Sequence, residues 1–197
     1  MVIKRLVVGQ LYTNCYLVSS KNKNAFIIDP GGDIQIIREY IIKETLKVSF
    51  IINTHSHIDH IKAACELGFP VYIHKLDAPA LEDPRNNYSA SLFGDFKACK
   101  PAKLLQDKEM IKLDELEVEV IHTPGHTPGG ICLKIENAVF TGDTLFKDGI
   151  GRTDFPGGSY EQLISSIRNR LLCLEDNIKI YPGHGESSTI GRERNSF

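Results

Sequence analysis

Short apolar runs bounded by Gly, Pro or Asp recur along the whole chain, with longer amphipathic segments between them. Runs of this kind, rich in Val, Ile and Phe, are typical of buried strands. The pattern predicts strands over Val2–Val8, Asn14–Ser19, Ala25–Asp29, Val48–Asn53, Val71–His74, Glu117–His122, Gly130–Ile135, Ala138–Thr141 and Ile178–Tyr181. It predicts helices over Ile34–Glu44, Ile58–Leu67, Ala78–Glu82 and Tyr160–Leu172. The order of these elements indicates a mixed α/β protein.

Two residues mark helix starts. Asp33 precedes the first predicted helix and Ser159 the last, and both are residue types that favour the N-cap position. Gln162, three positions after Ser159, would complete a capping box. No repeat, low-complexity tract or linker divides the chain, so a single domain over residues 1–197 is expected.

Composition narrows the class of protein. The chain has 197 residues, of which 42% are hydrophobic, and this suits one well-buried domain. Its formal net charge is −2 and it contains no run of Lys or Arg, which argues against nucleic acid or a membrane surface as a partner. The N-terminal segment has no apolar signal-peptide region, and no apolar stretch approaches about 18 residues. A cytoplasmic protein is therefore expected.

The cysteines give no pairing pattern. Five occur, an odd number, and they are widely scattered without a Cys-x-x-Cys motif. Neither a disulfide framework nor a zinc ribbon is expected. Cys65, Cys132 and Cys173 lie among apolar residues and are expected to be small core side chains. Nothing marks Cys99 as a nucleophile.

The most informative segment is His55-Ser56-His57-Ile58-Asp59-His60, which holds three of the seven histidines. Imidazole nitrogen and carboxylate oxygen are the ligands that Zn, Fe and Mn prefer. In an extended segment His55, His57 and Asp59 project to one side and His60 to the other. Such a segment supplies two neighbouring ions more easily than it wraps one. A polar loop that is merely histidine-rich is the alternative.

Three further candidates argue against that alternative. His126, Asp143 and His184 each lie in a Gly or Pro turn directly after an apolar run, where a strand would deliver a side chain to the end of a sheet. A structural zinc takes about four protein ligands and a catalytic zinc about three. Seven candidates exceed what one ion can use, whereas two ions roughly 3.5–4 Å apart and bridged by one carboxylate use them all.

The string His-x-His-x-Asp-His, followed by isolated His, Asp and His in that order, resembles the metallo-β-lactamase fold superfamily. The likeness runs from about the first predicted strand to the last residues. Two stretches, Gly142–Phe146 and Gly151–Gly158 (Gly-Arg-Thr-Asp-Phe-Pro-Gly-Gly), resemble more narrowly the short, single-domain hydroxyacylglutathione hydrolases, which are glyoxalase II-like proteins. The resemblance implies a four-layer αββα sandwich with its ligands on loops at one edge.

It also implies how the seven candidates are shared between two divalent ions, with zinc expected first and iron or manganese as alternatives. The first ion would be bound by His55, His57 and His126. The second would be bound by Asp59, His60 and His184, and Asp143 would bridge the two. Asp59 would also orient the metal-bound hydroxide as a catalytic residue.

The reaction implied is hydrolysis of a small-molecule thioester such as S-lactoylglutathione by a metal-bridging hydroxide. An amine needs a positioned acid in order to leave, whereas a thiol with a pKa of roughly 8.5 leaves as the thiolate. No such acid is evident outside the metal set, which favours thioesters over β-lactams. The alternatives are a lactonase and a mononuclear iron persulfide dioxygenase, which would use His55, His126 and Asp143. A non-catalytic scaffold of the same fold would be expected to lack part of the ligand set.

Other residues have two interpretations each. Asp29 is either a hydrogen-bond acceptor for a ligand histidine or a capping carboxylate. Gly31-Gly32 forms either a simple turn or a close approach of the backbone to the site. His74 and His122 match no ligand position and are expected to be structural, with His122 holding the loop of His126.

Substrate contacts are the least defined part of the site. Arg152 either pairs with Asp154 to stiffen its loop, or it has a functional role, which is to support the metal ligands or to meet an anionic substrate group. Longer glyoxalase II proteins bind glutathione through cations on a C-terminal helical domain, for which this sequence has no counterpart. Lys147, Arg152, Lys97 and Arg85 are the candidates to replace those cations. Residues Arg85–Gly94 are expected to form a loop over the site, with Tyr88 and Phe93 as pocket walls.

Overall fold

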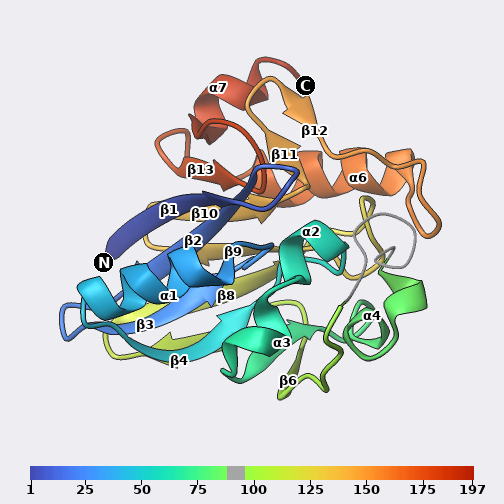
Figure 1. The fold of residues 1–197 in the computed structure, drawn as a ribbon. Helices are drawn as coiled ribbons and strands as arrows, with labels where there is room; N and C mark the ends of the chain where they lie inside the picture. Colours follow the sequence, from blue (N-terminus) through green and yellow to red (C-terminus); the bar gives the residue numbers. More distant parts are fainter. Residues whose placement is uncertain (88–95) are drawn as a thin grey trace.

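In the computed structural model, which describes residues 1–87 and 96–197, two six-stranded sheets lie face to face (Figure 1). The first sheet contains, in spatial order, β1 (Val2–Val8), β2 (Thr13–Ser19), β3 (Asn24–Ile28), β4 (Lys47–Ile52), β5 (Val71–His74) and β6 (Lys103–Leu105). The second contains β14 (Ser188–Thr189), β13 (Lys179–Pro182), β10 (Ala138–Gly142), β9 (Ile131–Ile135), β8 (Leu116–His122) and β7 (Met110–Leu113). A separate two-stranded hairpin is formed by β11 (Leu145–Phe146) and β12 (Gly149–Ile150).

The helices lie on the outer faces of both sheets. Those that follow strands of the first sheet are α1 (Ile34–Lys43), α2 (Ile58–Ile61), α3 (Ala64–Leu67), α4 (Pro79–Glu82) and a 3₁₀ turn, Pro84–Asn86. Those of the second half are α6 (Tyr160–Ser166), a π-helical turn over Ile167–Leu171, and α7 (Ile190–Arg194).

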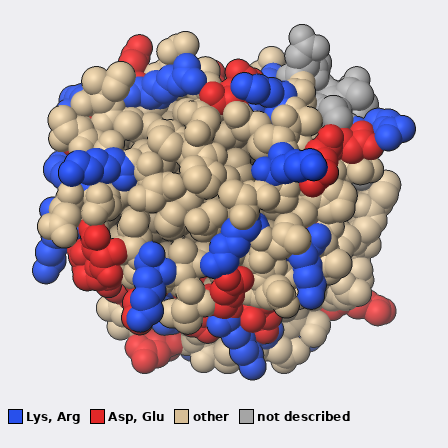
Figure 2. All heavy atoms as spheres, turned by 90° about the horizontal axis from the view of Figure 1, so that it is seen from below, with Lys and Arg blue, Asp and Glu red and all other residues tan. Residues whose placement is uncertain are grey.

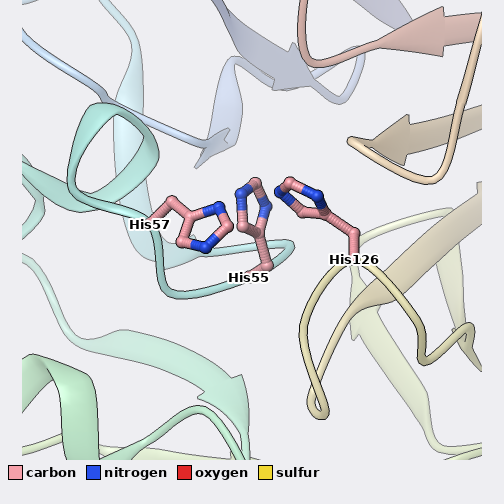
Figure 3. A group of neighbouring side chains, drawn as sticks. All are labelled: His55, His57 and His126. Atoms are coloured by element: carbon pink, nitrogen blue, oxygen red, sulfur yellow. The ribbon is translucent and has the colours of Figure 1, made fainter. Parts of the chain in front are cut away.

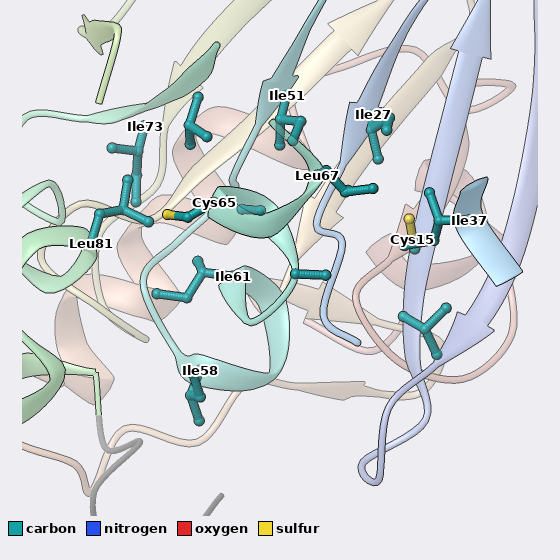
Figure 4. Packing of buried hydrophobic residues seen from close by; sticks show 14 of the residues in the cluster. Cys15, Ile27, Ile37, Ile51, Ile58, Ile61, Cys65, Leu67, Ile73 and Leu81 are labelled. Carbon is teal, nitrogen blue, oxygen red and sulfur yellow. The ribbon is translucent and has the colours of Figure 1, made fainter. Parts of the chain in front are cut away.

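Three apolar clusters define four layers. Ile37 of α1 packs with Ile27 and Ile51 of the first sheet (Figure 4). The neighbouring residues of the same strands, such as Phe26, point the other way and pack against Phe140 between the sheets, because side chains alternate along a strand. The outer face of the second sheet packs on α6 and α7. The order is therefore helix, sheet, sheet, helix, and the αββα sandwich implied by the resemblance is confirmed.

An aromatic cluster joins the two sheets close to the end of β13. The Tyr16 ring lies edge-on to Phe140 at 5.1 Å between centroids, and Phe140 stacks on Tyr181 at the same distance. The Tyr16 hydroxyl donates a 2.7 Å hydrogen bond to the Pro182 carbonyl. This contact fixes the strand end that carries the loop of His184.

Two predicted helices are interrupted. The segment predicted as Ile58–Leu67 divides into α2 and α3, because the Ala63 N–H donates a 2.9 Å hydrogen bond to the Pro30 carbonyl. The segment predicted as Tyr160–Leu172 changes from α6 to a π-helical turn, where the Leu172 N–H reaches back to the Ile167 carbonyl. Both changes depend on contacts or winding that local sequence patterns do not encode.

The two expected caps differ in outcome. The Ser159 hydroxyl accepts a 3.3 Å hydrogen bond from the Gln162 N–H, as expected of an N-cap. The capping box is not completed, because the Ser159 N–H donates instead to the Gly125 carbonyl at 2.8 Å and ties α6 to the loop of His126. Asp33 precedes α1, but its carboxylate accepts from the Gly9 N–H at 2.8 Å rather than from the helix.

The expectation that no cysteines pair is wrong. Cys65 of α3 and Cys99 form a disulfide, with their Cα atoms 5.6 Å apart. They are 34 positions apart in the sequence, and they meet because the Cys99 N–H is hydrogen-bonded to the Leu81 carbonyl beside α3. Cys173 is exposed rather than part of the core, whereas Cys132 is buried as expected.

One face of the molecule carries surface charges of both signs. Figure 2 shows Lys and Arg side chains and Asp and Glu side chains interspersed with uncharged residues on the face seen from below.

Among residues 1–87 and 96–197, no helix combines the length and apolar character needed to cross a bilayer.

The aromatic cluster gives a test of the packing. Phe140 is fully buried, so we expect Phe140→Ala to lower the free energy of unfolding by about 3–5 kcal/mol through lost burial and a cavity. Ile42→Ala is the control, because Ile42 is 75% exposed and its truncation is expected to change stability by less than about 0.5 kcal/mol. Denaturant titrations measure both values. Equal effects of the two substitutions would contradict this description of the core.

Candidate metal centre

All candidate ligands follow strands that end at one edge of the sandwich. In the first sheet β3, β4 and β5 run parallel, so their carboxyl ends lie together. In the second sheet β8 and β10 are each antiparallel to β9, and β10 is parallel to β13, so these three also end together. The loop after β4 carries His55 and His57, and the loop after β8 carries His126. Figure 3 shows the three rings turned toward one another from these two loops.

The structure brings all seven candidate residues together, as two neighbouring groups of three with Asp143 between them. One ligand atom from each of His55, His57 and His126 lies within 4.8 Å of the others, and the same holds for Asp59, His60 and His184. Asp143 lies between the groups. Its Oδ1 is 3.4 Å from His60 Nε2 and its Oδ2 is 3.6 Å from His126 Nε2.

Hydrogen bonds on the outer side of the histidine rings define which nitrogen carries the proton. Nδ1 of His60 lies 2.9 Å from Asp29 Oδ2, Nδ1 of His126 lies 2.7 Å from the Arg152 carbonyl, and Nδ1 of His184 lies 3.1 Å from the Leu11 carbonyl. A carbonyl or carboxylate oxygen only accepts, so Nδ1 donates in each pair. The Nε2 lone pair of each neutral ring therefore faces the centre.

His55 follows the same scheme through a hydroxyl. Thr54 Oγ1 donates to Asp29 Oδ2 at 2.6 Å, so its lone pair accepts from His55 Nδ1 at 3.1 Å. Within the part of the chain that the structure describes, Nε2 of His55, Nε2 of His126 and Oδ1 of Asp143 are buried without a hydrogen-bond partner. Convergent lone pairs and carboxylates repel one another unless cations lie between them. The donor set therefore fits divalent metal ions.

The pKa values show where a proton would reside without such ions. Burial lowers the pKa of His55, and burial together with the neighbouring His126 and His60 lowers that of His57 to about 3. Burial also opposes the charge on His60, but the carboxylates of Asp143, Asp59 and Asp29 outweigh it and raise the pKa of His60 to about 10. The same environment thus keeps His55 and His57 neutral, as metal ligands must be, and attracts positive charge beside the carboxylates.

Glycines allow the loops to approach this closely. A Cβ on Gly31 would overlap the Asp59 carbonyl, and a Cβ on Gly183 would overlap the Asp143 carboxylate and lie 2.7 Å from His60 Cε1. The Gly31-Gly32 turn is therefore a close approach of the backbone to the site.

Two buried carboxylates outside the seven candidates hold the loops in place. Asp29 accepts hydrogen bonds from the Thr54 N–H at 2.7 Å and from His60, so it orients ligand candidates rather than capping a helix. Asp77 joins the two loops of Figure 3, since it accepts from the Ser56 N–H, the Thr127 hydroxyl and the Gly129 N–H at 3.0, 2.7 and 2.6 Å. Sequence reasoning missed Asp77. Its position just after a predicted strand, like that of the ligand candidates, is the signal that could have found it.

The two remaining histidines are structural, as expected. The rings of His74 and His122 stack at 4.2 Å between centroids. His122 Nε2 donates a 2.9 Å hydrogen bond to the Pro128 carbonyl, so it holds the loop of His126.

The side chain of Arg152 pairs within its own loop, and its backbone supports a ligand candidate. Its guanidinium pairs with Asp154 at 2.7 Å and lies 4.0 Å from the centroid of the Phe155 ring. Its carbonyl accepts the hydrogen bond from His126, so the Arg152 backbone supports a ligand candidate. Of the other proposed cations, Lys147 pairs with Glu186 and Arg85 with Asp83.

A cavity of about 700 Å³ opens directly over the centre. Apart from five of the candidate ligands, it is lined by Leu11, Ile58, Asn87, Phe146, Ile150, Arg152 and Phe155. Tyr88 and Phe93, expected as pocket walls, lie outside the described residues.

Comparison with known proteins agrees with this geometry. Residues 8–184 match the family model of the metallo-beta-lactamase superfamily. The chain belongs to this superfamily. A Haemophilus influenzae relative of the superfamily, "Hydroxyacylglutathione hydrolase GloC", is 41% identical over 204 residues, covering 100% of this chain and 96% of the relative.

Two solved structures of metallo-beta-lactamase superfamily type are similar over nearly the whole chain. The "BLEG-1 B3 metallo-beta-lactamase" has a TM-score of 0.92 at 37% identity, covering 98% of this chain and 97% of that one. The structure of "TTHA1623 in a di-iron-bound form" has a TM-score of 0.86 at 32% identity, covering 96% of each chain. This protein is thus a metallo-hydrolase of the metallo-beta-lactamase fold, with a His and Asp cluster suited to divalent metal ions.

Asp77 gives the first test of the site. We expect Asp77→Asn to weaken metal binding at the group of His55, His57 and His126 by about 10- to 100-fold, because one of its hydrogen bonds to the two loops is lost. Binding at the other group should change little. Competition with a chromophoric chelator resolves the two affinities, and Asp114→Asn, at an exposed carboxylate, is the control. Equal loss at both groups would show that Asp77 has no selective positioning role.

Gly183 gives the second test. The Cβ of Gly183→Ala would displace the Asp143 carboxylate and the His60 ring, so bound metal per protein should fall. Gly149→Ala is the control, because a Cβ there meets nothing within 4 Å. Metal analysis after dialysis measures the stoichiometry. An unchanged stoichiometry in Gly183→Ala would contradict the assignment of Asp143 and His60 to the centre.

Proposed function

We propose that this protein hydrolyses thioesters, with S-lactoylglutathione as the first substrate to test, and that two divalent ions are its cofactors. His55, His57 and His126 would bind one ion, and Asp59, His60 and His184 the other, with Asp143 between them. Two such ions would supply an activated water nucleophile and a Lewis acid for the substrate carbonyl.

The protein's own residues would prepare the site for this chemistry. The hydrogen bonds from Nδ1–H hold four histidine rings in a fixed orientation before substrate arrives. Less free energy is then needed to rearrange these rings during the reaction. Asp59 Oδ2 accepts a 3.2 Å hydrogen bond from Thr13 and faces the cavity, where it would accept a hydrogen bond from the attacking water or hydroxide and orient it. The apolar cavity walls would exclude other water from the reacting carbonyl.

The choice of substrate rests on the lack of a proton donor for the leaving group among the described cavity walls. Among the described residues that line the cavity outside the ligand candidates, five are apolar and the others are Asn87 and Arg152. Neither the amide of Asn87 nor the guanidinium of Arg152 gives up a proton near neutral pH. An amine leaving group would need such a donor, whereas a thiol with a pKa of roughly 8.5 leaves as the thiolate. Thioester hydrolysis therefore needs no proton donor in this cavity, whereas β-lactam hydrolysis would need one.

The complete second group of ligand candidates favours a hydrolase over a mononuclear iron dioxygenase. A single ion held by His55, His126 and Asp143 would leave Asp59, His60 and His184 without a role, although these three lie within 4.8 Å of one another. A lactonase would use the same nucleophile and is the second candidate. It ranks below a thioesterase because an alcohol needs protonation to leave more than a thiol does.

The test is a substrate panel on protein whose metal content has been measured. S-Lactoylglutathione, a chromogenic β-lactam, a lactone and glutathione persulfide with oxygen are compared under one set of conditions. We expect two metals per chain and the highest kcat/KM on the thioester, and we expect His57→Ala to lose both a metal and more than about 100-fold of activity. One iron per chain with oxygen uptake, or faster cleavage of the β-lactam, would overturn the proposal.

A further inference from the structure

We infer that the cavity selects thioesters with an apolar acyl group of several carbons, carried on an anionic thiol whose charge meets Arg152. This inference deepens the proposed function and rests on it. It follows from the different chemistry of the two ends of the cavity, which we name the His57 end and the His184 end.

The His57 end carries the positive charge. The Phe155 ring lies edge-on to His57 at 5.4 Å between centroids, and the Arg152 guanidinium lies over that ring. Asp154 accepts from Nε and Nη2 of Arg152. A guanidinium has about five N–H donors in total, so it can meet a further carboxylate or phosphate at the same time. Arg152 is the one Lys or Arg among the described residues that line this cavity.

The His184 end is apolar. The Phe146 ring lies edge-on to His184 at 6.2 Å, and the carbonyl of Leu11 accepts the hydrogen bond from His184 Nδ1. Phe146 and Ile150 both line the cavity from the β11–β12 hairpin, which is anchored by the fully buried Leu145. The Leu11 side chain is 49% exposed at this end. An alkyl chain would cover this apolar surface.

A hydroxylated acyl group meets few hydrogen-bonding partners at the His184 end. Outside the ligand candidates, Asn87 and Arg152 are the polar residues among the described cavity walls. The Asn87 amide is buried and donates to the Ala80 carbonyl at 2.7 Å, and Arg152 lies at the His57 end. The hydroxyl of a lactoyl group would therefore lose hydration against Leu11 and Phe146 without a dedicated partner. A longer unsubstituted acyl chain gains burial there instead.

The carbonyl would lie over the centre, between the two ends. Hydrolysis breaks the carbon–sulfur bond and forms a carbon–oxygen bond to water. The sulfur leaves with the electron pair as thiolate, and the two protons of the water pass to solvent as the carboxylate forms. The released acid would then lie at the His184 end and the thiol at the His57 end.

The test is an acyl series on one carrier. We measure kcat/KM for S-acetyl-, S-lactoyl-, S-butanoyl- and S-hexanoylglutathione with the metal-loaded protein. We expect a rise of about fourfold per methylene group from acetyl to hexanoyl, with hexanoyl well above lactoyl. Leu11→Ala and Phe146→Ala should flatten the rise, and Leu104→Ala, at a leucine 52% exposed and away from the cavity, should leave it intact.

The carrier is tested separately. Arg152→Ala should raise KM for glutathione thioesters by about tenfold more than KM for the uncharged N-acetylcysteamine thioesters, which is the value of one charge-assisted contact. Inhibition by the thioether S-hexylglutathione should be stronger than by S-methylglutathione, which reports binding without catalysis.

The possible failures are distinct. Thioesters that are cleaved with lactoyl preferred over hexanoyl, or thioethers that inhibit equally at both chain lengths, would overturn this inference and leave the proposed function standing. No cleavage of any thioester by metal-loaded protein would overturn the proposed function itself.

Discussion

The orientation of the imidazole rings is the constraint on which the rest of the site depends. Four rings donate Nδ1–H away from the centre to Asp29, Thr54, Leu11 and Arg152, and this leaves their Nε2 lone pairs facing inward. The acceptors come from four separate segments of the chain. The position of each segment is therefore constrained. A small shift of any acceptor would rotate a ring and turn its Nε2 lone pair away from the centre.

The sandwich positions these residues at the ends of its strands. Six strands end at one edge, and the residues that follow them include Asp29, the His55–His60 segment, Asp77, His126, Asp143 and His184. Buried residues that follow the strands, such as Ile58 and Leu145, tie the segments beyond the strand ends to the core. Glycines at Gly31 and Gly183 then let backbone pass where any side chain would collide. Rigid strands and short loops together give the preorganisation that a catalytic centre needs.

Much of this could be predicted from the sequence, for reasons that are local. Residues after β4, β8, β10 and β13 have ligand chemistry and lie in turns, so His55, His126, Asp143 and His184 were recognisable as a set. The four-layer order came from family resemblance, because apolar runs alone do not specify how sheets stack. The break in the helix after His60 depends on the Pro30 carbonyl, which lies far away in the sequence. The Cys65–Cys99 disulfide depends on a similar long-range contact, so cysteine spacing gives no indication of it. The position of Asp77 just after a predicted strand marks it as a candidate, but its partners Thr127 and Gly129 are evident only in the fold.

The division of the ligand candidates between the two sheets has a consequence for the stability of the whole fold. The first half of the chain contributes His55, His57, Asp59 and His60, and the second half contributes His126, Asp143 and His184. An ion bound between the two sheets would act as a non-covalent crosslink between the halves, since neither half holds a complete set. Its free energy of binding would then add to that of sheet packing, so the free energy of unfolding would rise with the concentration of free metal.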